Sequence, residues 1–374
     1  MSEAVQKPLF DLTLTDEQQL MRETVRKFVQ KEMTTKEMRN ADEAAQAPNG
    51  FYEKAQELGF SLVSVPEAHG GLGADRSPLS NVLIAEDLAY GDMALAMGAM
   101  SSLSFVNALL DYGSDGQQAK YLPPFVEEAF RPAGVALMEP GLRRDVAKLS
   151  TAAVREGDQF VLRGEKVMVP FGSSAPQLLV IARVEGAGTC AFLVDRDTPG
   201  VSAERESYMG LRPLELARVK FDDVRLPVDR LLGEGQKSFD FQRFLNLSRI
   251  GLAALTVGTC KAVLDYVKEY CNDRVAFGEP ITNRQSVAFM IADIAIELDG
   301  LRLMTYRAAS RAEQGMPFSR EAFLSKLQAA DKGMKIGTDG VQLLGGHGFI
   351  RDHMVELYYR NLRAIALLDG VLSV

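Results

Sequence analysis

The sequence TAAVREGDQFVLRGEKVMV, residues 151–169, decides the architecture of this chain. Gly157-Asp158 forms a turn signal between two β-rich runs, with alternating side chains beyond it, and this pattern predicts a β-hairpin. Further short β-rich runs, separated by Gly, Pro and Asp, occupy the rest of residues 131–237. These runs do not have helical spacing, so the pattern predicts a middle β domain.

Helical spacing governs the chain before that domain. Thr15 is a helix start signal. Leu20, Val25, Phe28 and Val29 follow it at roughly 3.6-residue spacing, which predicts that they share one buried face. A later, strongly apolar run predicts one or two helices that are buried on most sides.

The chain returns to helical spacing from about residue 238. Three long amphipathic segments, residues 243–275, 286–315 and 319–346, predict a helical bundle. The expected fold class is therefore α+β. It consists of an N-terminal helical domain over residues 1–130, a middle β domain over 131–237 and a C-terminal helical bundle over 238–374.

Composition excludes several classes of protein. The 374 residues carry 42 Lys+Arg and 50 Asp+Glu, a net charge of −8, whereas a nucleic-acid-binding face needs a basic excess. With 47% hydrophobic and 25% charged residues, the chain is expected to be globular. No run is expected to reach the roughly 18 apolar residues of a membrane span, and the N-terminus lacks the apolar core of a signal peptide. We therefore expect a cytoplasmic protein.

Cysteine and histidine are sparse in the chain. Cys190, Cys260 and Cys271 lack CxxC spacing, which is typical of a reducing compartment. The three histidines form no cluster with cysteines or carboxylates at metal-ligand spacing. The sequence therefore predicts no catalytic metal.

Six strings, in the same order along the chain, carry a resemblance to a known family. They are PEAHGGLGAD (66–75), ALMEPGLRRD (136–145), LRGEKVMVPFG (162–172), MGLRPLELARVKFDDVRLP (209–227), RVAFGEPITNRQ (274–285) and QLLGGHGFIRDHMVELYYRNLRAIALLDG (342–370). With the helix–strand–helix order, they resemble the acyl-CoA dehydrogenase family of flavoproteins over nearly the whole chain. The resemblance implies α,β-desaturation of an acyl-CoA thioester with FAD as cofactor, an electron-transfer flavoprotein as acceptor, and a dimer of dimers.

The resemblance assigns the catalytic base to Asp369. It stands in the string Leu368-Asp369-Gly370-Val371, where the family usually has Glu. Aspartate keeps the charge on a stem shorter by one methylene, and misplacement of about 1 Å can cost ~10²-fold in rate. Asp369 can alternatively be a structural residue before a helix-terminating glycine, and Gly370 is expected at the C′ position in either case.

This sequence has no carboxylate at the second position where the family can place its base. Some family members have a Glu just before an Arg on another helix, where this chain has Ser248-Arg249. Arg249 itself matches a family residue near the thioester end of the acyl site. The resemblance therefore implies that Arg249 binds substrate.

The residues that reach a neighbouring subunit's FAD in the family are kept. They include Arg274, whose guanidinium suits a pyrophosphate, and paired glycines that allow close backbone approach. The full set that the resemblance implies is Arg274, Phe277, Gln285, Gln342, Gly345 and Gly346.

The residues expected to hold the chain's own isoalloxazine ring are altered. Met138 replaces a hydroxyl residue, and Met168 replaces an aromatic wall, although methionine can still pack against the ring. Pro170 removes both a hydroxyl and a backbone donor. Arg143 and Arg144 can bind a phosphate, fill space beside the cofactor, or form a solvated turn.

These features leave three functions open. The first is an FAD-dependent acyl-CoA dehydrogenase with Asp369 as its base. The second is a partner subunit of a hetero-oligomer that completes a neighbour's FAD site while its own site is vestigial. The third keeps the flavin but acts on nitroalkanes or on cyclic acyl thioesters. Acyl specificity would depend on a pocket lined by residues 88–104 and 242–253, where Met93, Met97 and Met100 are expected to be core residues.

Overall fold

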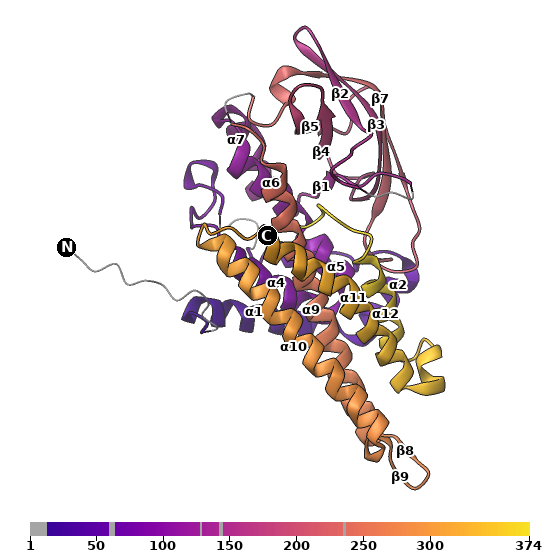
Figure 1. The fold of residues 1–374 in the computed structure, drawn as a ribbon. Helices are drawn as coiled ribbons and strands as arrows, with labels where there is room; N and C mark the ends of the chain where they lie inside the picture. The colour runs from indigo at the N-terminus through magenta and orange to yellow at the C-terminus, as the bar shows by residue number, and fades with distance from the viewer. Residues whose placement is uncertain (1–12, 60–63, 128, 142–144, 235–236) are drawn as a thin grey trace, which may run out of the picture.

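A computed structural model describes residues 13–59, 64–127, 129–141, 145–234 and 237–374 of the chain. Helices come first, strands follow, and helices return, which confirms the α+β architecture. The β domain lies at one end of the molecule, and the helices of both helical regions pack together beneath it (Figure 1).

The N-terminal region begins with a well-capped helix. Thr15 and Gln18 form a capping box at its start, as the start signal predicted. Val25 and Val29 are buried, but the prediction for Leu20 is wrong, because 66% of this residue is exposed. Leu20 precedes Val25 by five residues, which turns it about 140° away from that face. The helices of this region are α1 (Asp16–Glu32), α2 (Thr35–Ala44), α3 (Phe51–Gln56), α4 (Pro78–Gly91), α5 (Met93–Ala99), α6 (Ser101–Tyr112), α7 (Asp115–Tyr121) and α8 (Pro123–Glu127).

The strongly apolar run forms three helices, α4, α5 and α6, rather than one or two. It is divided at Asp92, whose carboxylate accepts a hydrogen bond from the Leu95 amide at the start of α5, and again at Met100. Met93, Met97 and Met100 are fully buried in the core, as predicted. Helices α4, α5 and α6 are therefore the buried helices around which the other helices pack.

Two helical stretches are long and apolar enough to cross a membrane by length and composition alone. They are Met93–Tyr112 and Phe241–Asp273, so the expectation that no run approaches this length is wrong. Both are packed inside the protein, with 94% and 78% of their most apolar 18-residue window buried. Core helices of soluble proteins pass the same test, so this finding is weak support for a span.

The middle region is a β-sheet of seven strands within the described residues, in the order β1-β4-β2-β3-β7-β6 with β5 paired to β4. The predicted hairpin is confirmed: β2 and β3 pair antiparallel, with Glu156 opposite Gln159 across the Gly-Asp turn. Strand β4 pairs parallel with both β1 and β2. The strands are β1 (Ala133–Ala136), β2 (Ala152–Glu156), β3 (Gln159–Pro170), β4 (Gln177–Val184), β5 (Gly188–Asp195), β6 (Val201–Arg205) and β7 (Leu216–Pro227).

Three long helices dominate the C-terminal region, as predicted: α9 (Phe241–Asp273), α10 (Gln285–Glu313) and α11 (Ser319–Leu343). A short helix, α12 (Val355–Ala364), follows the 3-10 turn η4 (Gly345–Phe349). Helices α9 and α10 extend away from the β domain, and the small hairpin of β8 (Val275–Ala276) and β9 (Glu279–Pro280) joins them at the far end (Figure 1).

A buried carboxylate joins the three regions of the fold. Asp42 in α2 is only 1% exposed, and its carboxylate accepts hydrogen bonds from Arg360 in α12 at 2.8 and 2.9 Å. Arg351 donates to the same group at 2.9 Å, and Arg212, between β6 and β7, lies 3.6 Å away. Asp42 stands two residues before the end of α2, a position that gives no sequence sign of this role.

Asp92 gives a prediction on pH-dependent stability. Burial raises the pKa of this carboxyl from 3.8 to about 6. Its contribution to stability is therefore complete below about pH 3.8 and lost as the pH rises through about 6. Asp92→Asn keeps a side chain that can cap α5 and removes the buried charge. We expect the variant to be more stable than the wild type by about 1–3 kcal/mol at pH 7.5, with the gain vanishing near pH 4.

Urea unfolding of both proteins at several pH values measures this difference. A gain of the same size at pH 4 and pH 7.5 would contradict the assignment, because a change in packing or capping does not titrate.

Candidate active site

Asp369 lies in an irregular segment that follows the last helix. Helix α12 ends at Ala364 with Ile365 as its C-cap, so the interpretation of Gly370 as the glycine that terminates this helix is wrong. Gly370 has φ +76°, and an added Cβ would lie 2.4 Å from the side chain of Leu137. The glycine is therefore required by the close approach of this segment to the β domain.

Two cations face the Asp369 carboxylate. Arg249 Nε from α9 lies 3.8 Å from Asp369 Oδ1, and Lys326 Nζ from α11 lies 3.6 Å from the same oxygen. Oδ1 is buried and has no hydrogen-bond partner, although 22% of the Asp369 side chain is exposed. A buried acceptor without a donor costs free energy and calls for an explanation.

Lys326 was missed by the sequence reasoning. Its ammonium donates a 2.6 Å hydrogen bond to the carbonyl oxygen of Leu368, which holds the backbone just before Asp369. Burial lowers the pKa of Lys326, Asp369 acts to raise it, and Arg249 acts to lower it. In the sequence Lys326 is one of several basic residues in an amphipathic helix, so only the tertiary structure assigns it to the site.

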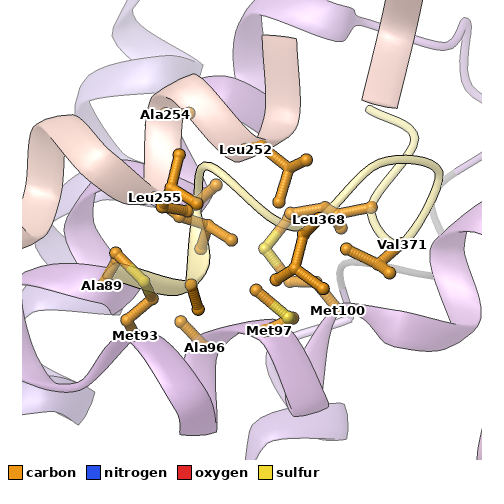
Figure 2. Packing of buried hydrophobic residues seen from close by; sticks show 14 of the residues in the cluster. Ala89, Met93, Ala96, Met97, Met100, Leu252, Ala254, Leu255, Leu368 and Val371 are labelled. Atoms are coloured by element: carbon orange, nitrogen blue, oxygen red, sulfur yellow. The ribbon is translucent and has the colours of Figure 1, made fainter. Parts of the chain in front are cut away.

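The apolar region beside Asp369 is filled by side chains. Leu368 and Val371 of the C-terminal segment lie among Met97, Met100 and Leu252 (Figure 2). All five are buried. This is the region between residues 88–104 and 242–253 in which the sequence predicted an acyl pocket, and in this conformation it is core.

The residues predicted to reach a neighbour's FAD come together in part. Arg274, Gln342, Gly345 and Gly346 line one cavity of about 360 Å³ between the end of α9 and η4. Arg274 is the C-cap of α9, and its amide donates to the carbonyl oxygen of Tyr270 at 2.8 Å. A Cβ added at either glycine would meet no atom within 4 Å. The cavity thus offers a cation and open backbone to a ligand.

The other two residues of this set do not line the cavity. Phe277 is 95% exposed at the β8–β9 hairpin, with φ +57° and its ring 5.5 Å from the Arg284 guanidinium. Gln285 is exposed at the first position of α10. Both residues are exposed at the far end of the long helices.

His347 closes one side of the same cavity. Its Nδ1 is 2.7 Å from the hydroxyl of Tyr270, and its ring stacks on His353 with 5.3 Å between centroids. His353 pairs in the same way with Tyr266 at 2.8 Å. These contacts give His347 a structural role beside the cavity.

The residues predicted to face the chain's own flavin ring are buried. Met138 and Met168 both belong to the core, and Met168 has φ +54°. Phe171 packs edge-on against Tyr52 with 5.4 Å between ring centroids, in the place just after Pro170. Arg143 and Arg144 lie outside the described residues. This side of the site presents packed apolar groups rather than an open surface for a planar ring.

A larger cavity, of about 680 Å³, lies away from Asp369, between α1, α4, α9 and α10. Its charged side chains satisfy one another: Arg22 donates to Asp87 at 2.6 and 2.7 Å, and Arg302 and Tyr306 donate to Glu86 at 3.1 and 2.7 Å. The cavity therefore requires no ligand, and its size does not make it the active site.

Models of one protein family match the chain in three consecutive parts. The N-terminal domain of acyl-CoA dehydrogenase matches residues 15–129, its middle domain matches 134–224, and its C-terminal domain matches 240–374. The three-part fold and these matches define a flavoprotein oxidoreductase. The chain belongs to the acyl-CoA dehydrogenase family.

Known proteins agree with this assignment. The chain is 33% identical over 365 residues to the mitochondrial short-chain specific acyl-CoA dehydrogenase of Rattus norvegicus, covering 96% of this chain and 87% of that protein. It is 31% identical to subunit CarC of the caffeyl-CoA reductase-Etf complex of Acetobacterium woodii, covering 96% of each. The solved structure of butyryl-CoA dehydrogenase from Megasphaera elsdenii superposes with a TM-score of 0.86 at 28% identity, covering 97% of each chain.

Members of this family are FAD-dependent, and a tetramer is typical of them. The described residues fit the cofactor unevenly. The cavity with Arg274 and the open glycines suits the diphosphate of an FAD held by a neighbouring chain. Buried Met138 and Met168 do not fit a flavin ring of the chain's own in this conformation.

Proposed function

We propose that this chain works in the FAD-dependent α,β-desaturation of an acyl-CoA thioester, with Asp369 as the base that removes the α-proton. The observation that carries the proposal is the buried, unpartnered Oδ1 of Asp369 beside Arg249 and Lys326. A general base needs an acceptor atom that is free to take a proton.

The other two side chains have roles that follow from their charge. Arg249, at 3.8 Å from the carboxylate, would orient the thioester end of the substrate beside the base. Lys326 holds the backbone of Leu368, and so fixes the start of the segment that carries Asp369. The chemistry that FAD supplies in this family is acceptance of the β-hydrogen as hydride.

The direct test is anaerobic addition of butyryl-CoA to the purified, FAD-loaded oligomer. We expect the flavin absorbance near 450 nm, a general property of oxidised flavins, to bleach in proportion to the thioester added. Bleaching by nitroethane instead would favour the nitroalkane reaction. An oligomer that takes up FAD and is bleached by neither compound would contradict desaturation by this chain.

A second candidate function is favoured by the uneven fit to FAD. The chain would be a partner subunit that completes a neighbour's flavin site through Arg274, Gln342 and the paired glycines, while its own site remains closed. Its open cation-lined cavity and its buried Met138 and Met168 support this arrangement. A complex with a homologous chain should then contain about one FAD for every two chains.

Arg274→Ala separates the contribution across the subunit boundary from the chain's own site. The variant removes the guanidinium that suits a diphosphate, and charge-assisted hydrogen bonds are worth more than neutral ones. We expect FAD affinity of the assembled oligomer to fall about tenfold or more. Arg311→Ala, a residue with its own partners at Pro317 and Glu321, is the control for loss of an arginine elsewhere. Unchanged FAD affinity in Arg274→Ala would contradict the role.

The acceptor and compartment are part of the same proposal. An electron-transfer flavoprotein is the proposed acceptor, supported by the relative that is a subunit of an Etf complex. A cytoplasmic location is supported by three cysteines that are all unpaired in the fold. Acyl chain length, and the choice between linear and cyclic thioesters, depend on the shape of the region that is filled here.

A further inference from the structure

The last four residues, 371–374, run through the interior of the molecule. All of them are buried, and the C-terminus lies among the helices beneath the β domain (Figure 1). They follow Asp369 directly, and Val371 packs in the apolar region beside it (Figure 2). We call residues 371–374 the C-terminal segment.

Side chains from α6, from α9 and from the irregular stretch before α4 bind the backbone of the C-terminal segment. Two backbone amides of the segment donate to serine hydroxyls: Ser373 to Ser104 Oγ at 2.7 Å and Leu372 to Ser248 Oγ at 3.4 Å. Three backbone carbonyls accept from side chains. Ser104 donates to Val371 at 3.4 Å, Asn107 donates to Ser373 at 2.9 Å, and Arg76 donates to Val374. The segment is therefore held by directional bonds as well as by packing.

Two of these partner side chains, Ser104 and Ser248, belong to the stretches 88–104 and 242–253 that were predicted to line an acyl pocket. Ser104 and Asn107 are on α6, Ser248 precedes Arg249 on α9, and all three are buried. A buried hydroxyl or amide left without a partner costs about 1–3 kcal/mol. Any molecule that replaces the segment must therefore bring hydrogen-bonding groups of the same kind as a peptide backbone.

An acyl-CoA thioester carries such groups. Its pantetheine arm contains two amides, each with one N–H donor and one carbonyl acceptor, and the thioester adds a further carbonyl. The acyl chain is apolar, like the side chains of Leu372 and Val374. The thioester can thus offer to Ser104, Asn107 and Ser248 the donors and acceptors that the segment now offers.

We propose that the C-terminal segment is an internal plug of the acyl site, which a CoA thioester must displace to reach Asp369. The proposal rests on the proposed function for the identity of the site. It explains why the region beside the base is filled although the base itself has an unpartnered oxygen. While the segment is in place, thioester cannot bind. The apparent affinity for thioester is therefore lower than the intrinsic affinity, in proportion to the small fraction of molecules from whose acyl site the segment is displaced.

Gly251 offers a specific way to loosen the plug. A Cβ at this position in α9 would lie 2.5 Å from the Leu372 carbonyl oxygen and 3.0 Å from the side chains of Leu372 and Val374. The three nearest atoms all belong to the C-terminal segment, so Gly251→Ala acts against the plug. Gly300→Ala is the matched control, because a Cβ there, in α10, meets nothing within 4 Å.

The experiment combines amide hydrogen exchange with thioester binding on the full chain. In the wild type, we expect the Leu372 and Ser373 amides to be protected and to become exposed when butyryl-CoA binds. In Gly251→Ala, we expect these amides to exchange at least about tenfold faster and butyryl-CoA to bind about tenfold more tightly. Gly300→Ala should match the wild type in both measurements. Asn107→Ala, which removes the bond to the Ser373 carbonyl, should speed exchange of the same amides, while thioester binding loses the Asn107 contact as well.

Two results would overturn the plug. One is butyryl-CoA bound to the wild type while the Leu372 and Ser373 amides stay protected, because ligand and segment would then coexist. The other is amide exchange in Gly251→Ala and Asn107→Ala, together with thioester affinity in Gly251→Ala, all within about twofold of the wild type. If the amides are released and butyryl-CoA binds but no flavin is bleached, the plug stands and the assignment of Asp369 as base fails.

Discussion

Asp369→Asn should lower the rate of thioester-dependent flavin reduction by about 10²–10⁴-fold, the usual contribution of a general base. The amide of asparagine has nearly the shape of the carboxylate but cannot accept a proton at neutral pH. The loss should appear in the rate of bleaching after rapid mixing with excess butyryl-CoA. FAD content should remain that of the wild type, whereas the midpoint of urea unfolding can fall, because the substitution removes the charge that faces Arg249 and Lys326.

Asp369→Glu is the companion variant. Glutamate keeps the charge and lengthens the stem by one methylene, so it should retain a rate within about 10²-fold of the wild type. Rescue by the longer carboxylate distinguishes a base from a residue that only packs. A bleaching rate in Asp369→Asn equal to that of the wild type would show that Asp369 is structural and would leave the partner-subunit function as the better account.

Asp42→Ala should be among the most destabilising single substitutions in the chain. Removal of one partner from a buried ion pair costs about 3–5 kcal/mol, because the remaining charge stays buried without compensation. Asp42 is almost fully buried, and the Arg360 guanidinium binds both of its oxygens. Arg360 keeps Glu356 at 2.7 Å, so we expect a loss at the lower end of this range. The effect should appear as a lower urea midpoint at constant slope.

Asp299→Ala is the control for the removal of an aspartate that binds an arginine. Asp299 accepts from Arg302 at 3.1 Å, but most of its side chain is exposed, and exposed pairs contribute little. Its urea midpoint should stay close to that of the wild type. Equal midpoints for Asp42→Ala and the wild type would contradict the role of Asp42 as the junction of the three regions.

The fold could be predicted from sequence because its signals are local. The Gly157-Asp158 turn between alternating runs predicts the β2–β3 hairpin, and the long amphipathic segments predict α9, α10 and α11. Periodicity and turn chemistry are properties of a few neighbouring residues, so they can be read without knowledge of the rest of the chain. The same local reasoning failed for Leu20, because five residues separate it from Val25 and this separation places it on another face of the helix.

The candidate site could be predicted only in outline. The resemblance identified Asp369 and Arg249, which the structure brings within 3.8 Å of each other from different elements. Lys326, Ser104 and Asn107 carried no signal, because each is an ordinary polar residue in a helix until the chain folds. Phe277 and Gln285 belong to the same expected group as Arg274, yet they do not line the cavity that Arg274 lines.

By itself, the sequence determined the order of the three regions, the membership of a flavoprotein family and the identity of the candidate base. Only the tertiary structure decided that residues 371–374 fill the region beside that base, that Asp42 ties the three regions together, and that Met138 and Met168 are buried. The physical reason is the range of the interactions. Helices, strands and turns arise from contacts between near neighbours along the chain, whereas burial and the pairing of distant charges depend on which elements meet.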